Sequence, residues 1–164
     1  MSVEKSIFGI QTGLLGIWIH NEYGLSNQIV LRSELGLDSG FFASSDEFTF
    51  LMTPVLTLES RWYYNLEKRN AKNKNIKNNS GNFLALKTSY NPDLFTISNA
   101  ENVRVINQIS IIPKWAIKRT YFDHLTFETG VGIGQVFYLG KSSQYLAKKS
   151  ETVLDLHLRI GYTF

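Results

Sequence analysis

The chain lacks several features that would place it in common protein classes. None of its 164 residues is cysteine, so it offers neither a disulfide framework nor a thiolate metal site. Proline is scarce, with three residues, and no apolar run approaches the roughly 20 residues of a membrane-spanning helix. The segment from Met1 to Lys5 has no apolar centre and no small-residue cleavage site, so we do not expect it to be a secretory signal peptide.

Charge and glycine patterns exclude further classes. The net charge is only +3, and much of the excess lies between Lys68 and Lys77, so we do not expect nucleic acid as a partner. Glycines at 130, 132 and 134 alternate within one extended segment, whereas a phosphate-binding loop needs a turn that leads into a helix. We expect no cofactor and no metal site.

What the sequence does contain is apolar–polar alternation with period two from end to end. It predicts seven strands, at 7–20, 27–38, 48–65, 82–91, 102–118, 124–139 and 152–164. The intervening segments are rich in Asn, Asp, Ser, Gly and Lys, as turns require. Most of these strands exceed the usual length of about 5–6 residues and suit a membrane-spanning strand of about 9–11. No linker interrupts the pattern, so residues 1–164 are expected to form one domain.

Each predicted strand has one apolar and one polar face. Residues 154, 156, 158, 160, 162 and 164 of the last strand are all apolar or aromatic. The polar faces carry charges of both signs, and we predict that they meet in one interior network: Arg32, Glu34, Glu59, Arg61, Lys87, Arg104, Lys114, Glu128, Asp155, His157 and Arg159. A membrane barrel would turn these faces inward, whereas a soluble barrel would turn them to water.

Aromatic residues and glycines favour the membrane arrangement. Trp18, Tyr64, Trp115 and Tyr162 lie near strand ends, as do the aromatic girdles at membrane interfaces. The glycines at 130–134 fall on the polar face, where a crowded barrel interior favours small residues.

The C-terminus resembles the signature of bacterial outer-membrane barrel proteins, which is an amphipathic final strand with an aromatic residue two before the end and a terminal Phe. The matching residues here are Leu156, Leu158, Ile160, Tyr162 and Phe164. The resemblance implies an antiparallel, up-and-down, closed transmembrane β-barrel in the outer membrane of a Gram-negative bacterium. It also implies that Tyr162 and Phe164 serve as an assembly signal for the barrel-assembly machinery during insertion, by strand pairing at an open edge.

A second stretch, Gly13 to Leu37, looks like the short periplasmic hairpin of small porin-family barrels. It is carried by the turn from Gly24 to Asn27 and by the run from Leu31 to Leu35. Such barrels usually have an even number of strands. We therefore expect about eight, with the eighth between 38 and 50, in a divided long strand, or upstream of Met1. Eight strands leave an interior that side chains fill, so we expect no wide channel.

Histidine is the main candidate for chemistry. His20 and His124 lie near predicted strand ends, where we expect turn or interface roles. His157 is a candidate base oriented by Asp155, although we favour a hydrogen-bonded member of the interior network. No His-X-Ser pair matches that of barrel enzymes that modify lipids.

We therefore expect a non-enzymatic outer-membrane barrel with a structural, binding or accessory role. Its expected partners are outer-membrane lipid and an envelope protein. The alternatives are a lipid-modifying outer-membrane barrel enzyme built around His157 or His20, and a soluble lipocalin-like carrier of an apolar ligand.

The segment from 67 to 81 is basic and rich in Asn, and we expect a solvated, mobile loop. The alternative is contact with lipid phosphates or with an acidic partner. If Phe164 ends in the periplasm, the turns at 119–123 and 21–26 and this basic segment are also periplasmic. The segments 91–101 and 140–151 are then extracellular, and strand 7–20 begins outside unless a missing strand precedes it.

Overall fold

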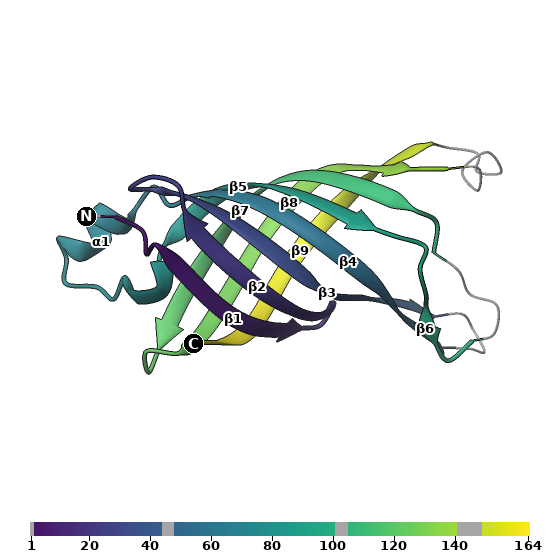
Figure 1. The fold of residues 1–164 in the computed structure, drawn as a ribbon, viewed down its shortest axis with the longest axis horizontal. Coiled ribbons are helices and arrows are strands. Elements are labelled where there is room, and N and C mark those ends of the chain that lie inside the picture. The colour runs from purple at the N-terminus through teal and green to yellow at the C-terminus, as the bar shows by residue number, and fades with distance from the viewer. Residues whose placement is uncertain (1, 44–47, 101–104, 141–148) are drawn as a thin grey trace.

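A computed structural model describes residues 2–43, 48–100, 105–140 and 149–164 (Figure 1). Strands dominate these residues, because the period-two alternation of the sequence places apolar and polar side chains on opposite faces of extended backbone. The elements in chain order are β1 (Ser6–Gly13), β2 (Gly16–Gly24), β3 (Ile29–Ala43), β4 (Phe48–Trp62), α1 (Leu66–Asn70), η1 (Lys77–Asn79), β5 (Asn82–Asn91), β6 (Ile97–Ser98), β7 (Gln108–Tyr121), β8 (Leu125–Tyr138) and β9 (Ser150–Thr163).

Eight of these strands close into a barrel. Each of β1, β2, β3, β4, β5, β7, β8 and β9 pairs with the next in antiparallel register, and β9 pairs with β1. The two-residue β6 pairs with Leu51 and Met52 of β4 outside this closed ring. The prediction of an all-β, antiparallel, up-and-down closed barrel of about eight strands is confirmed.

The eighth strand comes from the division of the predicted strand 7–20. A tight turn at Leu14 and Leu15 separates β1 from β2. Gly16 follows with a φ of 143°, and a Cβ there would lie 2.0 Å from the carbonyl oxygen of Leu37, so the turn requires glycine. Both turn residues are apolar, so they continue the apolar pattern of the strand. The sequence therefore gives no polar turn signal at this position.

The barrel has two distinct ends. At the terminal end, on the left of Figure 1, lie both chain termini, the short connections at 25–28 and 122–124, and the segment 63–81. At the opposite end, the loop end, β3, β5 and β8 end and β4, β7 and β9 begin. The chain therefore enters the barrel at the same end as its C-terminus. The expectation that the first strand begins at the opposite end is wrong, because the turn that reverses it was missed.

The segment 63–81 is folded against the terminal end. Tyr63 and Leu66 pack with Val3, Val30 and Phe83 in a small buried apolar cluster. This packing extends the barrel interior with an apolar layer and covers its terminal end.

Asparagines of η1 tie the same segment to the rim of the barrel. The Asn78 backbone N–H donates to Glu4 Oε1 at 2.6 Å, and its side chain donates to the carbonyl of Asp123 at 2.7 Å. Asn79 is fully buried and donates to Glu22 Oε2 at 3.0 Å. The prediction of a solvated loop is therefore wrong for this part of the segment, where asparagine serves as a buried hydrogen-bonding group.

The outer wall of the barrel is apolar. Leu156, Leu158 and Ile160 are 60%, 49% and 48% exposed, and the other outward positions of the strands are mostly Leu, Ile, Val, Phe or Tyr. Continuous exposed apolar surface of this kind is rare on soluble monomers. The described residues also contain no helix that is long and apolar enough to cross a membrane.

The predicted aromatic positions divide between the two faces. Tyr64, Trp115 and Tyr162 are exposed on the outer side near the terminal end. Trp18 is buried instead, and its indole N–H donates to Asp38 at 2.9 Å inside the barrel. The prediction that Trp18 belongs to an outer girdle is wrong, because the turn at 14–15 resets the alternation that the longer strand would have had.

The β1–β2 hairpin is shorter than its neighbours. On β1, Gly9 to Gly13 pair with Arg159 to Thr163, and no other part of β9 reaches β1. Among the described residues, the backbone of β9 from 150 to 158 and of β3 from 40 to 43 is therefore paired on one side only. Beyond the tip of the β1–β2 hairpin the described parts of these two edges are not paired with each other.

Candidate functional site: the charged barrel interior

The polar faces of the strands meet inside the barrel as buried charge. Ten of the eleven residues predicted for the interior network are described, and eight of these are buried: Arg32, Glu34, Glu59, Arg61, Lys114, Glu128, His157 and Arg159. Lys87 and Asp155 lie nearer the loop end, where they are half-buried and form an ion pair at 3.1 Å. Arg104 lies outside the described residues.

Glu128 on β8 is the centre of the network. Its Oε1 accepts hydrogen bonds from Gln11 at 3.1 Å and from Arg32 and Arg61, each at 3.2 Å. Its Oε2 accepts a second bond from Arg61 at 3.1 Å and lies 3.1 Å from His157 Nε2. One carboxylate on β8 therefore contacts side chains from four other strands.

Glu22 on β2 is a second centre, one that the sequence analysis missed. Its Oε1 accepts from Arg32 at 3.0 Å, from Arg61 at 2.9 Å and from Lys118 at 2.8 Å. Glu22 and Lys118 were missed for different reasons. Glu22 lies beyond residue 20, where the first predicted strand ends. Lys118 is the last residue of the predicted strand 102–118 and was not included among the network residues.

Glu34 on β3 pairs with two arginines. Arg159 donates to both of its carboxylate oxygens at 2.9 Å, and Arg32 Nε donates to Oε1. The Arg159 guanidinium also lies 3.7 Å from the ring centroid of Trp18, a cation–π contact. The buried indole therefore helps to hold a charged group in place.

Glu59 on β4 completes the network with a pair of cations. Arg61 Nε donates to Glu59 Oε1 at 2.7 Å, and Lys114 Nζ lies 3.0 Å from Oε2. Isolated buried charges are costly, so an interior of this kind needs cations and carboxylates in similar number with their hydrogen-bonding capacity satisfied. The buried cations are Arg32, Arg61, Lys114, Lys118 and Arg159, and the buried carboxylates are Glu22, Glu34, Glu59 and Glu128.

Small residues make room for these long side chains. At Gly130 a Cβ would lie 2.5 Å from Ala116 Cβ, and at Gly132 it would lie 2.6 Å from Lys114 Cβ. The three alternating glycines of β8 thus face crowded interior positions. Long side chains of the neighbouring strands fill the space that these residues leave.

The contacts of His157 fit the network better than a catalytic base. Its Nδ1 lies 3.0 Å from Lys114 Nζ, and its Nε2 lies 3.1 Å from Glu128 Oε2. Asp155, the proposed orienting residue, bonds Lys87 instead. Both ring nitrogens therefore already have polar neighbours within the protein.

The other two histidines differ from each other. His124 lies in the β7–β8 turn, where its Nδ1 is 2.7 Å from the carbonyl oxygen of Thr163 and its ring stacks on Tyr162. His20 is buried inside the barrel, so the prediction of a turn or interface position is wrong for it. Within the described part of the chain neither of its ring nitrogens has a hydrogen-bond partner. The same residues contain no group of three His, Asp or Glu placed to hold a metal ion.

The two residues predicted as an assembly signal lie on the outside of the terminal end. Tyr162 and Phe164 are 47% and 78% exposed, with ring centroids 5.4 Å apart. The backbone N–H of Phe164 donates to the carbonyl of Phe8 at 2.9 Å, so the last residue is paired with β1. In the closed barrel the aromatic side chains of this part of β9 are exposed, but its backbone is already paired with β1.

Comparison with known proteins gives no relative: no family model, no curated protein and no solved structure matches this chain.

Proposed function

We propose that the barrel spans a bacterial outer membrane and serves there as a non-enzymatic structural, binding or accessory protein. One observation carries the proposal: the strands place charge inside and apolar side chains outside, which is the reverse of a water-soluble barrel. A lipocalin-like carrier would need apolar side chains around a central cavity. Here the corresponding positions hold a network of Arg, Lys and Glu, and Leu156, Leu158 and Ile160 face outward.

The proposed orientation places the terminal end in the periplasm. In support of it, the connections at 25–28 and 122–124 at this end are short, as periplasmic turns usually are. The basic segment 63–81 is long for a periplasmic connection, but it is folded onto the barrel. Protease added to intact cells should cut near Lys149 and spare Lys72 to Lys77, and the opposite pattern would reverse the orientation.

The membrane proposal is tested by extraction and gel behaviour. The protein should require detergent for extraction from envelopes, and the unheated sample should migrate differently from the boiled sample, because a closed barrel stays folded. In planar bilayers it should give no stable wide-channel conductance, since side chains fill the terminal half of the interior. Recovery in the aqueous fraction without detergent would contradict the proposal.

The absence of enzymatic activity is part of the proposal and has its own test. Purified protein should release no fatty acid from phospholipid or lipopolysaccharide. Lipid hydrolysis that disappears in His157→Ala but persists in His124→Ala would replace the non-enzymatic role with the enzymatic alternative.

A further inference from the structure

A cavity of about 400 Å³ at the terminal end is lined by basic side chains. Its lining residues are Tyr64, Asn65, Lys68, Arg69, Lys72, Lys74, Asn82 and Arg119, and we call it the basic cavity. Five of these carry positive charge and none carries negative charge. The barrel interior differs, because there each buried cation lies beside a carboxylate.

The two arginines of the basic cavity are held by neutral acceptors. Arg69 Nη2 donates to the carbonyl of Asn75 at 2.8 Å, and its Nε is buried without a hydrogen-bond partner among the described residues. Arg119 donates to Asn82 Oδ1 and to the carbonyl of Lys118, each at 2.7 Å. These contacts fix the guanidinium groups but leave their charge uncompensated.

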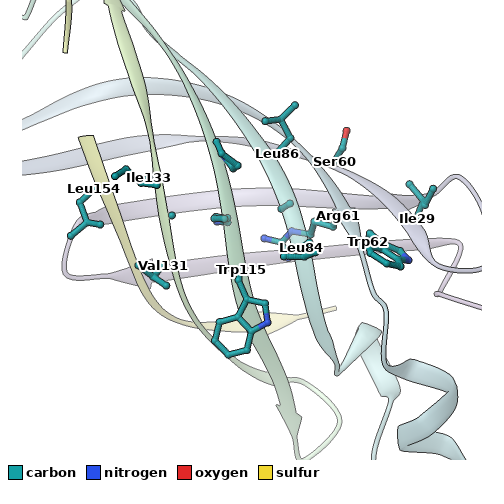
Figure 2. A pocket seen from close by; sticks show the side chains of 14 residues that line it. Ile29, Ser60, Arg61, Trp62, Leu84, Leu86, Trp115, Val131, Ile133 and Leu154 are labelled. Atoms are coloured by element: carbon teal, nitrogen blue, oxygen red, sulfur yellow. The ribbon is translucent and has the colours of Figure 1, made fainter. Parts of the chain in front are cut away.

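Next to the basic cavity an apolar groove of about 800 Å³ crosses the outer wall. Figure 2 shows the side chains that line this groove. The groove is lined on three neighbouring strands by Trp62 of β4, Leu84 and Leu86 of β5, and Pro113 and Trp115 of β7. The groove continues over β8 and β9 through Val131, Ile133 and Leu154.

The groove and the basic cavity follow one another on the same face of the same strands. On β5 the outward residues run from Leu84 in the groove to Asn82 in the cavity, and on β7 they run from Trp115 to Arg119. The Trp115 indole N–H donates to Tyr64 Oη at 2.8 Å, which links a groove residue to a cavity residue. Exposed Trp and Tyr of this kind are enriched at the level of lipid headgroups.

We propose that the basic cavity and the groove form one binding site for an anionic phospholipid of the adjacent leaflet. The phosphate lies among Arg69, Arg119 and the neighbouring lysines, and an acyl chain lies in the groove. The charge of the cavity selects the phosphate, and its continuity with an apolar groove selects a lipid over free phosphate. This inference rests on the proposed membrane insertion.

The site can be tested with lipids whose acyl chains carry bromine, which quench tryptophan fluorescence on contact. Trp62 and Trp115 line the groove, whereas the third tryptophan, Trp18, is buried inside the barrel and reports little. The full chain is reconstituted in vesicles that contain equal mole fractions of brominated phosphatidylglycerol or brominated phosphatidylcholine. Brominated phosphatidylglycerol should quench more strongly, because its net negative charge favours the basic cavity.

Two variants remove the charge and one control preserves the site. The first variant is Arg69→Gln/Arg119→Gln. The second is Lys68→Gln/Lys72→Gln, which changes exposed side chains only. Each should lower the relative affinity for phosphatidylglycerol by on the order of tenfold or more. The control is Lys5→Gln, which also replaces an exposed lysine at the terminal end but lies outside the basic cavity. It should keep the preference for phosphatidylglycerol over phosphatidylcholine. If the double arginine variant fails to fold, the double lysine variant still tests the site.

The outcomes separate this site from the membrane proposal. Equal quenching by the two brominated lipids, or a preference that survives in both double variants, would overturn the site and leave membrane insertion supported. No quenching by either lipid would overturn both. If millimolar inorganic phosphate abolishes the phosphatidylglycerol preference at constant ionic strength, set with chloride, the cavity binds phosphate without help from the groove, and the lipid assignment is wrong.

Discussion

The two halves of the barrel interior pair their polar groups in different ways. In the terminal half, Glu22 and Glu128 each accept from several cations, and some of these bonds join strands that are not neighbours, such as Glu22 on β2 with Lys118 on β7 and Glu128 on β8 with Arg61 on β4. In the loop half the bonds join only two or three side chains, such as Thr57 with Ser89 at 2.7 Å, or Asp38 with Trp18 and Asn91. A shared network fixes several strands at once, whereas a separate pair fixes only two. The terminal half should therefore set the stability of the barrel and the loop half should tolerate change.

Among these predictions, replacing Glu128 should cause the largest loss of stability. A small loss would contradict the proposed difference between the two halves. Glu128→Gln removes a negative charge that Arg32 and Arg61 share, and it should lower the free energy of unfolding by about 3–5 kcal/mol. The measurement is urea unfolding in detergent micelles followed by tryptophan fluorescence. Asp155→Asn in the loop half breaks a single ion pair whose side chains are mostly buried, and it should cost less, about 1–3 kcal/mol. Equal losses would contradict the difference between the halves.

Moving charge to the outer wall should have the next largest effect. Leu58 lies on β4 beside the inward Glu59, and its side chain is 49% exposed on the outside. Leu58→Arg should destabilise the protein reconstituted in bilayers by about 2–4 kcal/mol, because an arginine near the bilayer midplane is poorly solvated. Ser150→Arg, at the loop-end start of β9, should cost less than about 1 kcal/mol. Similar small values for both variants would argue against membrane burial of the outer wall.

Filling the interior should cost less than removing its charge. Gly132→Ala adds a Cβ that would lie 2.6 Å from Lys114 Cβ and 2.8 Å from the carbonyl oxygen of Pro113. Overpacking of this kind should destabilise the barrel by about 1–3 kcal/mol in the same urea assay. Val131→Ala on the opposite face is the control and should cost less, because that side chain is 46% exposed. A neutral Gly132→Ala would mean that the interior is less crowded than the contacts indicate.

The smallest effect is expected for a hydroxyl pair in the loop half. Thr57→Val removes one partner of Ser89 and should cost about 0.5–1.5 kcal/mol, the usual net contribution of one neutral hydrogen bond. The double variant Thr57→Val/Ser89→Ala should recover part of this loss, since both buried polar groups are then gone. A double variant that is worse than the sum of the single variants would show that the loop half also depends on a wider network.

The sequence was informative where alternation is long and uninterrupted. Strand β5 is found at the predicted residues 82–91, and β8 and β9 differ from prediction by at most two residues at each end. The burial of Arg32, Glu34, Glu59 and Arg61 follows from the same alternation, because residues two apart share a face. Fold class and interior charge were thus accessible from local patterns.

The features that the sequence analysis missed depend on an atypical turn or on contacts between residues distant in sequence. The turn at Leu14 and Leu15 has apolar residues where turns usually have polar ones, and its signal was the flanking Gly13 and Gly16. Missing it hid one strand and misplaced Trp18. The ordered segment 63–81 was missed because its asparagines resemble those of a solvated loop until Glu4 and Glu22 supply their partners. The basic cavity needs Arg119, which comes from β7, a strand distant in sequence.

The short pairing between β1 and β9 bears on the order of assembly. It joins Gly9–Gly13 to Arg159–Thr163, so it brings together the two ends of the chain through the shortest of the ladders that close the barrel. Every other barrel ladder joins two barrel strands that are consecutive along the chain. Most of these ladders can form as soon as the turn between their strands has formed. Closing so long a stretch of chain has the greatest entropic cost and returns few backbone hydrogen bonds. We expect this ladder to form last and to open first, so its amides should exchange with deuterium before those of the β3–β4 and β8–β9 ladders.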